Sequence, residues 1–267
     1  MVELDAAALL QVYDEQLRTH VPDRVPEGIR FERDGPLLRT VGFGNRGWIE
    51  YQDLGGLDGD ELDELIARQI RYFAERGEQF EWKLHGHDLP ADLPERLRAA
   101  GFVPEELETV VIVPVEAVAG EVHPPDGVTL REVRERADLE RIAAMEQAVW
   151  DDEDHGWLPD GLGRELVADP DGLVIVVAEA GESVVCAAWI RFPSSTDFGT
   201  LWGGATLPEW RRMGIYRAIV AYRANLARER GFRYLETDAS DDSRPILERL
   251  GFVPVTTTTP YVWSPPT

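Results

Sequence analysis

The feature that most restricts how this chain can fold is an internal repeat. Residues 74–77 (Ala-Glu-Arg-Gly) match residues 228–231 (Arg-Glu-Arg-Gly) at an offset of 154 positions, since residue 77 aligns with residue 231. Residues 97–104 (LRAAGFVP) resemble residues 247–254 (LERLGFVP) at an offset of 150, and a loop four residues longer in the first half explains the difference. Ordered matches beside equivalent predicted helices and strands indicate a duplicated structural unit.

The repeat divides the chain into two halves, which we predict to be domains at residues 1–120 and 121–267. The segment from Gly120 to Gly127 contains Pro124 and Pro125, a composition typical of a linker. A chain of 267 residues suits two modest domains, and its apolar content of 43% can supply a core to each.

The spacing of apolar residues predicts helices and strands in both halves, which places the chain in the α/β class. Helices are expected at residues 4–18, 60–76, 93–100, 137–150, 162–168, 215–230 and 244–250. Strands are expected at residues 29–33, 37–41, 48–51, 80–84, 110–115, 128–132, 174–179, 184–192, 200–206 and 234–238. A final extended pair is expected within residues 253–263.

The charge and the single cysteine restrict the partners and the compartment. A net charge of −23 opposes binding to nucleic acid or to an anionic membrane, because both require a positive surface. Cys186 has no second cysteine to pair with, which fits a reducing compartment. No apolar run approaches the roughly 18 residues that a membrane span needs. We therefore expect a soluble, cytoplasmic protein.

One basic segment stands out in this acidic chain. Residues 201–234 contain seven arginines and only two glutamates. A predicted strand ends at Pro208, a turn carries Arg211 and Arg212, and Gly214 opens the helix. Free N–H groups at a helix start, the helix dipole and nearby guanidinium groups together suit a pyrophosphate. The segment therefore predicts an anion site.

The equivalent segment of the first half has the opposite charge. Residues 53–60 (DLGGLDGD) contain three aspartates and no arginine, so they would repel a pyrophosphate. The sequence therefore predicts one anion site, in the second half.

At these residues the sequence resembles the GCN5-related N-acetyltransferase (GNAT) family in a tandem arrangement. The family's pyrophosphate motif is Arg or Gln, two residues, Gly, one residue, and Gly or Ala. Residues 211–216 (RRMGIY) are similar to it, with Tyr216 in place of the last small residue. Residues 206–208 (TLP) resemble the family's strand-end signature and residues 250–252 (LGF) its last-helix signature, in the family's order.

The resemblance implies two tandem GNAT-like domains, each a mixed, mostly antiparallel sheet flanked by helices, of which the first is degenerate. It also implies an N-acetyltransferase that moves an acetyl or other acyl group from acetyl-CoA to an amine by direct attack. Backbone N–H groups would hold the pyrophosphate, the pantetheine arm would pair with the strand edge, and the thioester would lie beside Gly203 and Gly204. The expected coenzyme-binding residues are Gly204, Ala205, Thr206, Arg211, Arg212, Met213, Gly214, Ile215 and Tyr216.

Two departures from the family leave other functions open. Trp202 stands where many members carry a strand glutamate, and Leu247 where many carry the tyrosine that protonates the departing thiolate. The second loss is tolerable, because a thiolate with a pKa of about 8.5 can leave without a proton. The alternatives are a non-catalytic acyl-CoA-binding or sensing module and a structural pseudo-enzyme that binds no coenzyme.

The acidic loop at residues 151–155 (DDEDH) lies where the family builds its substrate rim. Glu153 or His155 could accept a proton through water, and the aspartates could bind a cationic acceptor. A solvated acidic loop without chemistry is the alternative. The expected substrate contacts are Trp150, Asp151 and Trp202. The acceptor would be a small amine or an exposed amino group.

The remaining candidates have simpler explanations. His85 and His87 lie beside Asp88, but no second ligand cluster has suitable spacing, so no metal is predicted. Cys186 is expected to be inert core. Tyr216 is expected either to pack the first turn of its helix or to approach the coenzyme. The protein is expected to be a monomer or a homodimer.

Overall fold

The computed structural model of this chain describes residues 5–43, 46–150 and 155–266. Contacts between residues group the chain into two compact units. Unit 1 comprises Met1–Val21, Gly28–Val111 and Asp238–Thr267, and unit 2 comprises Pro22–Glu27 and Ile112–Thr237. The domains predicted at residues 1–120 and 121–267 were defined by the sequence repeat and not by contacts, and they stay a prediction.

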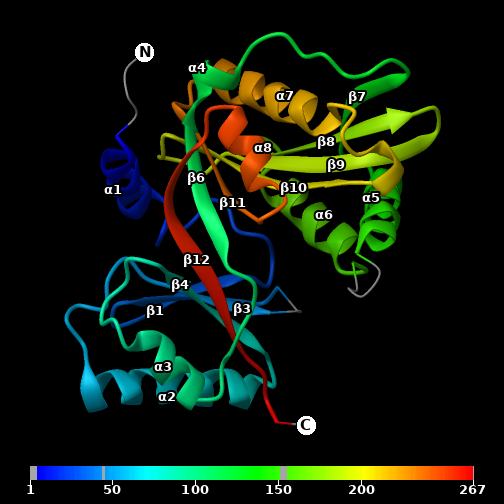
Figure 1. Cartoon of the computed structure of the whole chain (residues 1–267). Coiled ribbons are helices and arrows are strands. Elements are labelled where there is room, and N and C mark those ends of the chain that lie inside the picture. The colour runs from blue at the N-terminus through cyan, green and yellow to red at the C-terminus, as the bar shows by residue number, and fades with distance from the viewer. Residues whose placement is uncertain (1–4, 44–45, 151–154, 267) are drawn as a thin grey trace. The chain divides into compact units, whose positions relative to one another are not determined.

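Unit 1 is a mixed sheet with helices (Figure 1). Its helices are α1 (Ala6–Gln16), α2 (Gly59–Arg76), α3 (Leu93–Ala99) and α8 (Arg244–Arg249). Its strands are β1 (Arg30–Asp34), β2 (Leu37–Val41), β3 (Gly47–Glu50), β4 (Phe80–His85), β5 (Val103–Pro104) and β12 (Val253–Trp263), and β6 (Glu108–Pro114) contains the boundary between the units. The strand order is β1-β2-β3-β4-β12. β3 and β4 are parallel, and the other neighbours are antiparallel.

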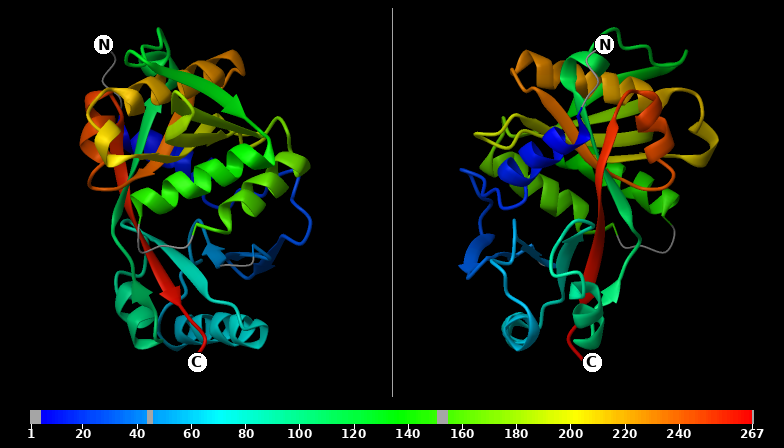
Figure 2. Two further views of the ribbon diagram at one scale, coloured as in Figure 1. Left: turned by 90° about the vertical axis from the view of Figure 1, so that its right-hand side faces the viewer. Right: turned by 60° about the vertical axis from the view of Figure 1, so that its left-hand side comes forward.

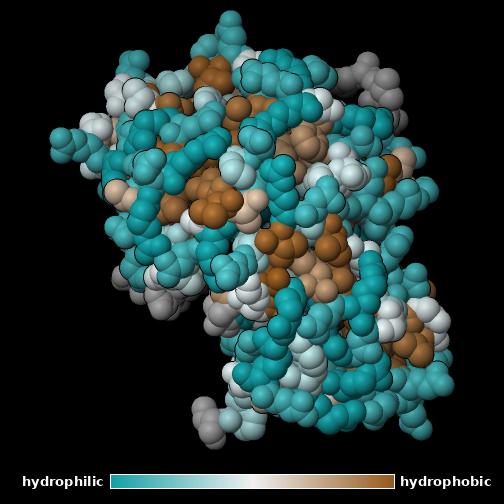
Figure 3. All heavy atoms as spheres, turned by 180° about the vertical axis from the view of Figure 1, so that it is seen from behind, coloured by the Kyte–Doolittle hydropathy of each residue, from teal (hydrophilic) through white to brown (hydrophobic). Residues whose placement is uncertain are grey.

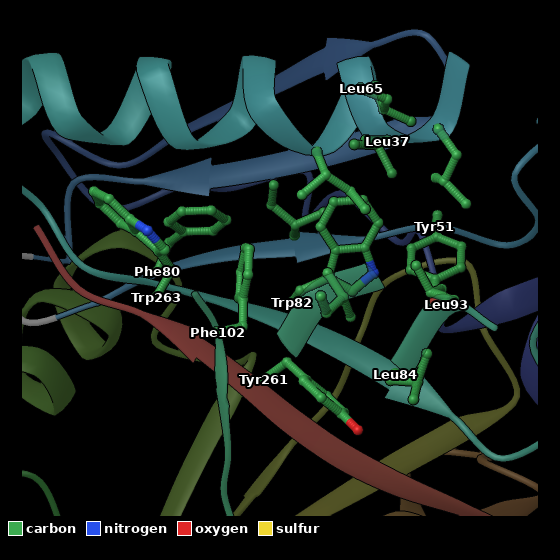
Figure 4. Close-up of a cluster of buried hydrophobic side chains, with 14 of the residues drawn as sticks. Leu37, Tyr51, Leu65, Phe80, Trp82, Leu84, Leu93, Phe102, Tyr261 and Trp263 are labelled. Carbon is green, nitrogen blue, oxygen red and sulfur yellow. The ribbon is translucent and has the colours of Figure 1, made fainter. Parts of the chain in front are cut away.

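The core of unit 1 lies between α2 and the sheet, because the apolar residues of α2 recur at helical spacing. The buried residues of α2 are Leu62, Leu65, Ile66, Gln69 and Phe73. Phe73 stacks on Phe80 of β4 with ring centroids 4.1 Å apart. Figure 4 shows Tyr261 and Trp263 of β12 in the same cluster as Phe80 and Trp82.

Unit 2 also combines strands of mixed direction with helices. Its strands are β7 (Val128–Val133), β8 (Leu173–Ala180), β9 (Ser183–Arg191), β10 (Phe198–Thr206) and β11 (Tyr234–Ala239), whose last two residues belong to unit 1. Its helices are α4 (Val115–Val118), α5 (Arg136–Val149), α6 (Leu158–Ala168), the 3₁₀ turn η1 (Pro208–Trp210) and α7 (Ile215–Glu229). The order is β7-β8-β9-β10-β11, and of these four described neighbouring pairs only β10 and β11 are parallel.

The helices of unit 2 cover the two faces of its sheet. α5 and α6 lie side by side (Figure 2) and share one apolar cluster with β8 and β9. Ile215 and Ile219 of α7 belong to a different cluster, which contains Cys186 and Ala188 of β9, whereas Ala187 and Trp189 belong to the cluster of α5 and α6. Since neighbouring residues of a strand point to opposite faces, α7 packs on the face opposite α5 and α6.

The repeat in the sequence corresponds to a repeated structural element. β3, α2 and β4 in the first half have the same order and the same parallel pairing as β10, α7 and β11 in the second. β4 begins at Phe80 and β11 begins at Tyr234, the offset of 154 found in the sequence. The expectation of a tandem α/β arrangement with strands of mixed direction is confirmed.

The C-terminal segment corrects one expectation. Residues 253–263 were expected to form an extended pair, but they form the single strand β12. β12 is antiparallel to β4 from Thr258 to Trp263, so the last strand of the second half joins the sheet of the first. A proline is unusual inside a central strand, because it cannot donate a ladder hydrogen bond. Here Pro260 lies opposite Lys83 within the ladder, and its carbonyl accepts a hydrogen bond from the N–H of Glu105 at 2.8 Å.

Two properties of the surface bear on partners. In the described ranges, no helix is both long and apolar enough to cross a membrane. Hydrophilic residues predominate on the face shown in Figure 3, with apolar residues in separate groups, which fits a chain with 29% charged residues.

Candidate functional site

The β10 strand is interrupted by a bulge at two glycines. Gly203 lies opposite Ala188 of β9, but Ala205 lies opposite Ala187, so Gly204 is the additional residue. Gly203 and Gly204 have φ values of 68° and 100°, which favour glycine. A Cβ atom at Gly203 would lie 2.7 Å from the Trp189 ring, and one at Gly204 would lie 2.6 Å from the Tyr216 ring. Both faces of the bulge are therefore filled, and no other residue fits.

Beyond this point β10 has an open edge. β10 pairs with β9 as far as Thr206, but with β11 only from Phe198 to Thr200. The Thr237 hydroxyl then donates to the carbonyl of Leu201 at 2.9 Å, in place of a backbone bond. Among the described residues the ladder between β10 and β11 ends at Thr200, so residues 202–206 of β10 lie beyond it. An open edge of this kind can pair with an extended ligand.

The turn after β10 presents a run of free N–H groups. Arg212 has a φ of 64° and Gly214 a φ of 91°, and α7 begins at Ile215. The first helical bond here joins the N–H of Ala218 to the carbonyl of Gly214 at 3.0 Å. The N–H groups of residues 212–217 donate to no acceptor within residues 5–43, 46–150 and 155–266. Successive free N–H groups at a helix start form an anion site.

Arg211 connects this turn to the open strand. Its Nε donates to the carbonyl of Thr206 at 3.0 Å, which holds its guanidinium group beside the end of β10. The first turn of α7 contains no acidic residue. The turn is therefore positively polarised by its backbone and carries no carboxylate that would compete for its N–H groups.

Comparison with known proteins identifies this arrangement. The sequence model of the Acetyltransferase (GNAT) family matches residues 139–252, which include the bulge, the turn and α7. Residues 139–252 form a GNAT acetyltransferase domain.

Solved structures agree with the GNAT fold and with its tandem arrangement. A GCN5-related N-acetyltransferase from Kribbella flavida has a TM-score of 0.65 and 19% identity, over 98% of this chain and 95% of that one. A tandem GNAT protein from the clavulanic acid biosynthesis pathway has a TM-score of 0.62 and 13% identity, over 91% and 86%. A GCN5-related N-acetyltransferase from Sphaerobacter thermophilus has a TM-score of 0.61 and 12% identity, over 87% and 82%. No curated protein sequence matches the chain significantly.

Trp202 and Leu247 occupy the two positions where many family members carry acid–base groups, and the structure shows the surroundings of both. Trp202 is 47% exposed, and its indole N–H donates to the Thr200 hydroxyl at 2.8 Å. The guanidinium group of Arg191 lies 4.6 Å from the Trp202 ring centroid and pairs with Glu165 at 2.7 Å. Contacts with Thr200 and Arg191 thus hold the Trp202 ring in place, and its side chain offers no group for acid–base chemistry. Leu247, in contrast, is fully buried.

The predicted catalytic and substrate residues are only partly visible. Glu153 and Asp151 lie outside the described residues. His155 is only 8% exposed, and its backbone N–H lies 3.5 Å from the side-chain oxygen of Gln147 on α5. Trp150 ends α5 and is partly exposed. The roles of these four residues stay predictions, as do those of the coenzyme-binding residues.

The structure decides the position of Tyr216 and Cys186. The Tyr216 ring packs against Gly204, and burial raises its pKa. Cys186 is fully buried and accepts a hydrogen bond from the Thr206 hydroxyl at 3.2 Å. Burial raises the pKa of its thiol to about 11, so the thiolate is disfavoured.

Two buried charged residues near the bulge were missed by sequence reasoning. Arg223 lies on the buried face of α7 with Ile219 and Ala227, and Glu146 lies on the buried face of α5 with Ile142. Glu146 is close enough to contribute to the raised pKa of Cys186. A charged residue at an apolar position of each helix was the available signal.

The segment of unit 1 that corresponds to the anion site has a different chemistry. The Asp53 side chain accepts the N–H of Gly55 at 2.6 Å, and Asp60 and Glu61 occupy the first turn of α2. The Tyr51 hydroxyl donates to Asp88 at 2.5 Å just beyond the paired part of β3 and β4. Carboxylates thus occupy the corresponding segment of unit 1, and the existence of one anion site stays a prediction.

Proposed function

We propose that this chain is an N-acetyltransferase that transfers the acetyl group of acetyl-CoA to an amine, with residues 121–267 as its coenzyme-binding domain and residues 1–120 as a degenerate partner. One observation carries the proposal. The run of free N–H groups at residues 212–217 lies directly after an open strand edge, inside a segment that matches the acetyltransferase family.

The residues of the site suit the parts of the coenzyme. The N–H groups of residues 212–217 and the guanidinium groups of Arg211 and Arg212 would hold the pyrophosphate. The open edge at Ala205 and Thr206 would pair with the amides of the pantetheine arm. The coenzyme supplies a thioester, which would lie beside the bulge.

The transfer needs one proton acceptor. The amine nitrogen attacks the thioester carbonyl carbon, the C–S bond breaks, and the nitrogen loses a proton. The sulfur can leave as a thiolate, because its pKa of about 8.5 requires no acid at the Leu247 position. We assign Glu153 or His155 as the acceptor of the amine proton, through a water molecule, since the Trp202 side chain cannot accept it.

The alternative function is an acyl-CoA-binding module that does not catalyse transfer. Trp202 and Leu247 occupy the two positions where many family members carry acid–base groups. A module that binds acyl-CoA without turning it over would keep the N–H groups of residues 212–217 and would need neither side chain. The two functions therefore differ in turnover and agree in coenzyme binding.

Coenzyme binding is tested first with a matched pair of variants. Gly214 has a φ of 91° and open space around its Cβ position, so Gly214→Glu and Gly214→Lys carry the same backbone strain and opposite charges. We expect acetyl-CoA to raise the melting temperature of the wild type and of Gly214→Lys, and to leave Gly214→Glu unchanged. Equal shifts in both variants would refute the anion site.

Turnover is tested next, by release of free thiol from acetyl-CoA with a panel of small amines and amino-terminal peptides. Continuous release with one of them supports the transferase. Tight coenzyme binding without release on any of them supports the binding module. Absence of both identifies a structural protein.

A further inference from the structure

Arg223 is a buried cation next to the bulge. It lies on α7, is 1% exposed, and donates from Nη1 to the carbonyls of Trp189 at 3.0 Å and Trp202 at 3.1 Å. Trp189 and Trp202 face each other on β9 and β10, immediately before the bulge at Gly203 and Gly204. One guanidinium nitrogen therefore bridges the two strands where their regular pairing ends.

This arrangement is costly for the fold. None of the ion pairs formed by the described residues includes Arg223. Burial lowers its pKa, and Tyr216 and Cys186 offset part of that effect. Removing a charged group from water without a counter-ion is unfavourable, and an apolar residue could fill the same helix face. The observation therefore calls for a role beyond packing.

Tyr216 belongs to the same group. It occupies the motif position where the family carries a small residue, and its ring fills the space above Gly204. Arg223 and Tyr216 are near enough to shift each other's pKa. Two side chains of α7 thus contact the bulge. The Tyr216 ring packs against Gly204, and Arg223 donates to the carbonyl of Trp202.

The contact with Trp202 also changes the peptide group that follows. The carbonyl of Trp202 and the N–H of Gly203 belong to one peptide unit. A cation that binds the carbonyl oxygen draws electron density from the unit, so the N–H becomes a stronger donor. Hydrogen bonds in a chain strengthen one another in this way.

We propose that Arg223 is a positioning residue for acyl transfer, which fixes the bulge and polarises the peptide between Trp202 and Gly203 beside the reacting thioester. This proposal rests on the proposed transferase function. Arg223 acts through the strand and touches no reacting atom. The backbone carbonyls that accept its hydrogen bonds belong to Ile219, Trp189 and Trp202, and none of them to residues 212–217, so we expect it to affect transfer more than coenzyme binding.

The test compares Arg223→Met, Arg223→Lys and the exposed control Arg228→Met on the same helix. We measure kcat with saturating amine, the acetyl-CoA Kd by calorimetry, and hydrogen exchange of the amides at residues 203–206. Arg223→Met is expected to lower kcat at least about tenfold with a much smaller change in Kd, less than the about 100-fold or more expected for loss of a whole oxyanion donor. Exchange at residues 203–206 should become faster.

The other variants complete the comparison. Arg223→Lys keeps the charge and should restore part of kcat, whereas Arg228→Met should behave as the wild type. The proposal is overturned if folded Arg223→Met keeps both kcat and the exchange rates, or if its Kd rises as much as its kcat falls. If the wild type turns over no amine, the transferase function fails together with the catalytic part of this proposal. If Arg223→Met then also leaves the exchange rates at residues 203–206 unchanged, the claim that Arg223 fixes the bulge fails as well.

Discussion

Gly204 provides the sharpest test of the bulge. In Gly204→Ala, the added Cβ atom would lie 2.6 Å from Cε2 of Tyr216, and the backbone would have to keep a φ of 100°. The unfavourable φ costs about 1–3 kcal/mol, and overpacking costs a further 1–3 kcal/mol or so. We therefore expect the free energy of unfolding to fall by roughly 2–6 kcal/mol.

A double-mutant cycle separates the two contributions. Tyr216→Ala removes the ring, so Gly204→Ala should cost only the backbone contribution in that background. The expected coupling between the two sites is about 1–3 kcal/mol, measured by urea unfolding. Gly181→Ala is the control, because Gly181 has a φ of 60° and nothing within 4 Å of its Cβ position. The packing argument is wrong if Gly204→Ala costs the same with and without the Tyr216 ring.

Two further predictions concern buried titratable groups. Because burial raises the pKa of Cys186 to about 11, iodoacetamide at pH 8 should modify the folded protein much more slowly than the urea-unfolded chain, and equal rates would contradict the assigned burial. Burial also raises the pKa of Glu50 from 4.5 to about 7, so the folded state binds its proton more tightly than the unfolded chain and loses stability as pH rises from about 4.5 to 7. Glu50→Gln should therefore raise the melting temperature more at pH 8 than at pH 5, and the reverse order would contradict the shift.

Local structure could be predicted well because local signals determine it. The predicted helix at 60–76 corresponds to α2 at Gly59–Arg76, and the predicted strand at 80–84 to β4 at Phe80–His85. Apolar spacing and terminal glycines carry this information in a few neighbouring residues. The predicted strands at 29–33 and 37–41 likewise correspond to β1 and β2, which the two-residue turn Gly35-Pro36 joins directly.

The pairing of distant strands could not be predicted. The sequence shows that residues 253–263 are extended, but not that Thr258–Trp263 pair with β4. Apolar alternation tells which face of a strand is buried and leaves its neighbour undetermined. The choice depends on the packed core, in which Tyr261 and Trp263 join Phe80 and Trp82.

For the anion site and the bulge, the sequence and the tertiary structure also determine different features. The sequence by itself determined the tandem repeat, the basic turn with Gly214 and the acidic counterpart at residues 53–60, because motif order and charge are written along the chain. Only the tertiary structure decided that Tyr216 fills the space above Gly204 and that Arg223 binds the carbonyls of β9 and β10. These contacts join elements far apart in sequence, and the burial that makes Arg223 and Tyr216 matter exists only once the strands and α7 pack together.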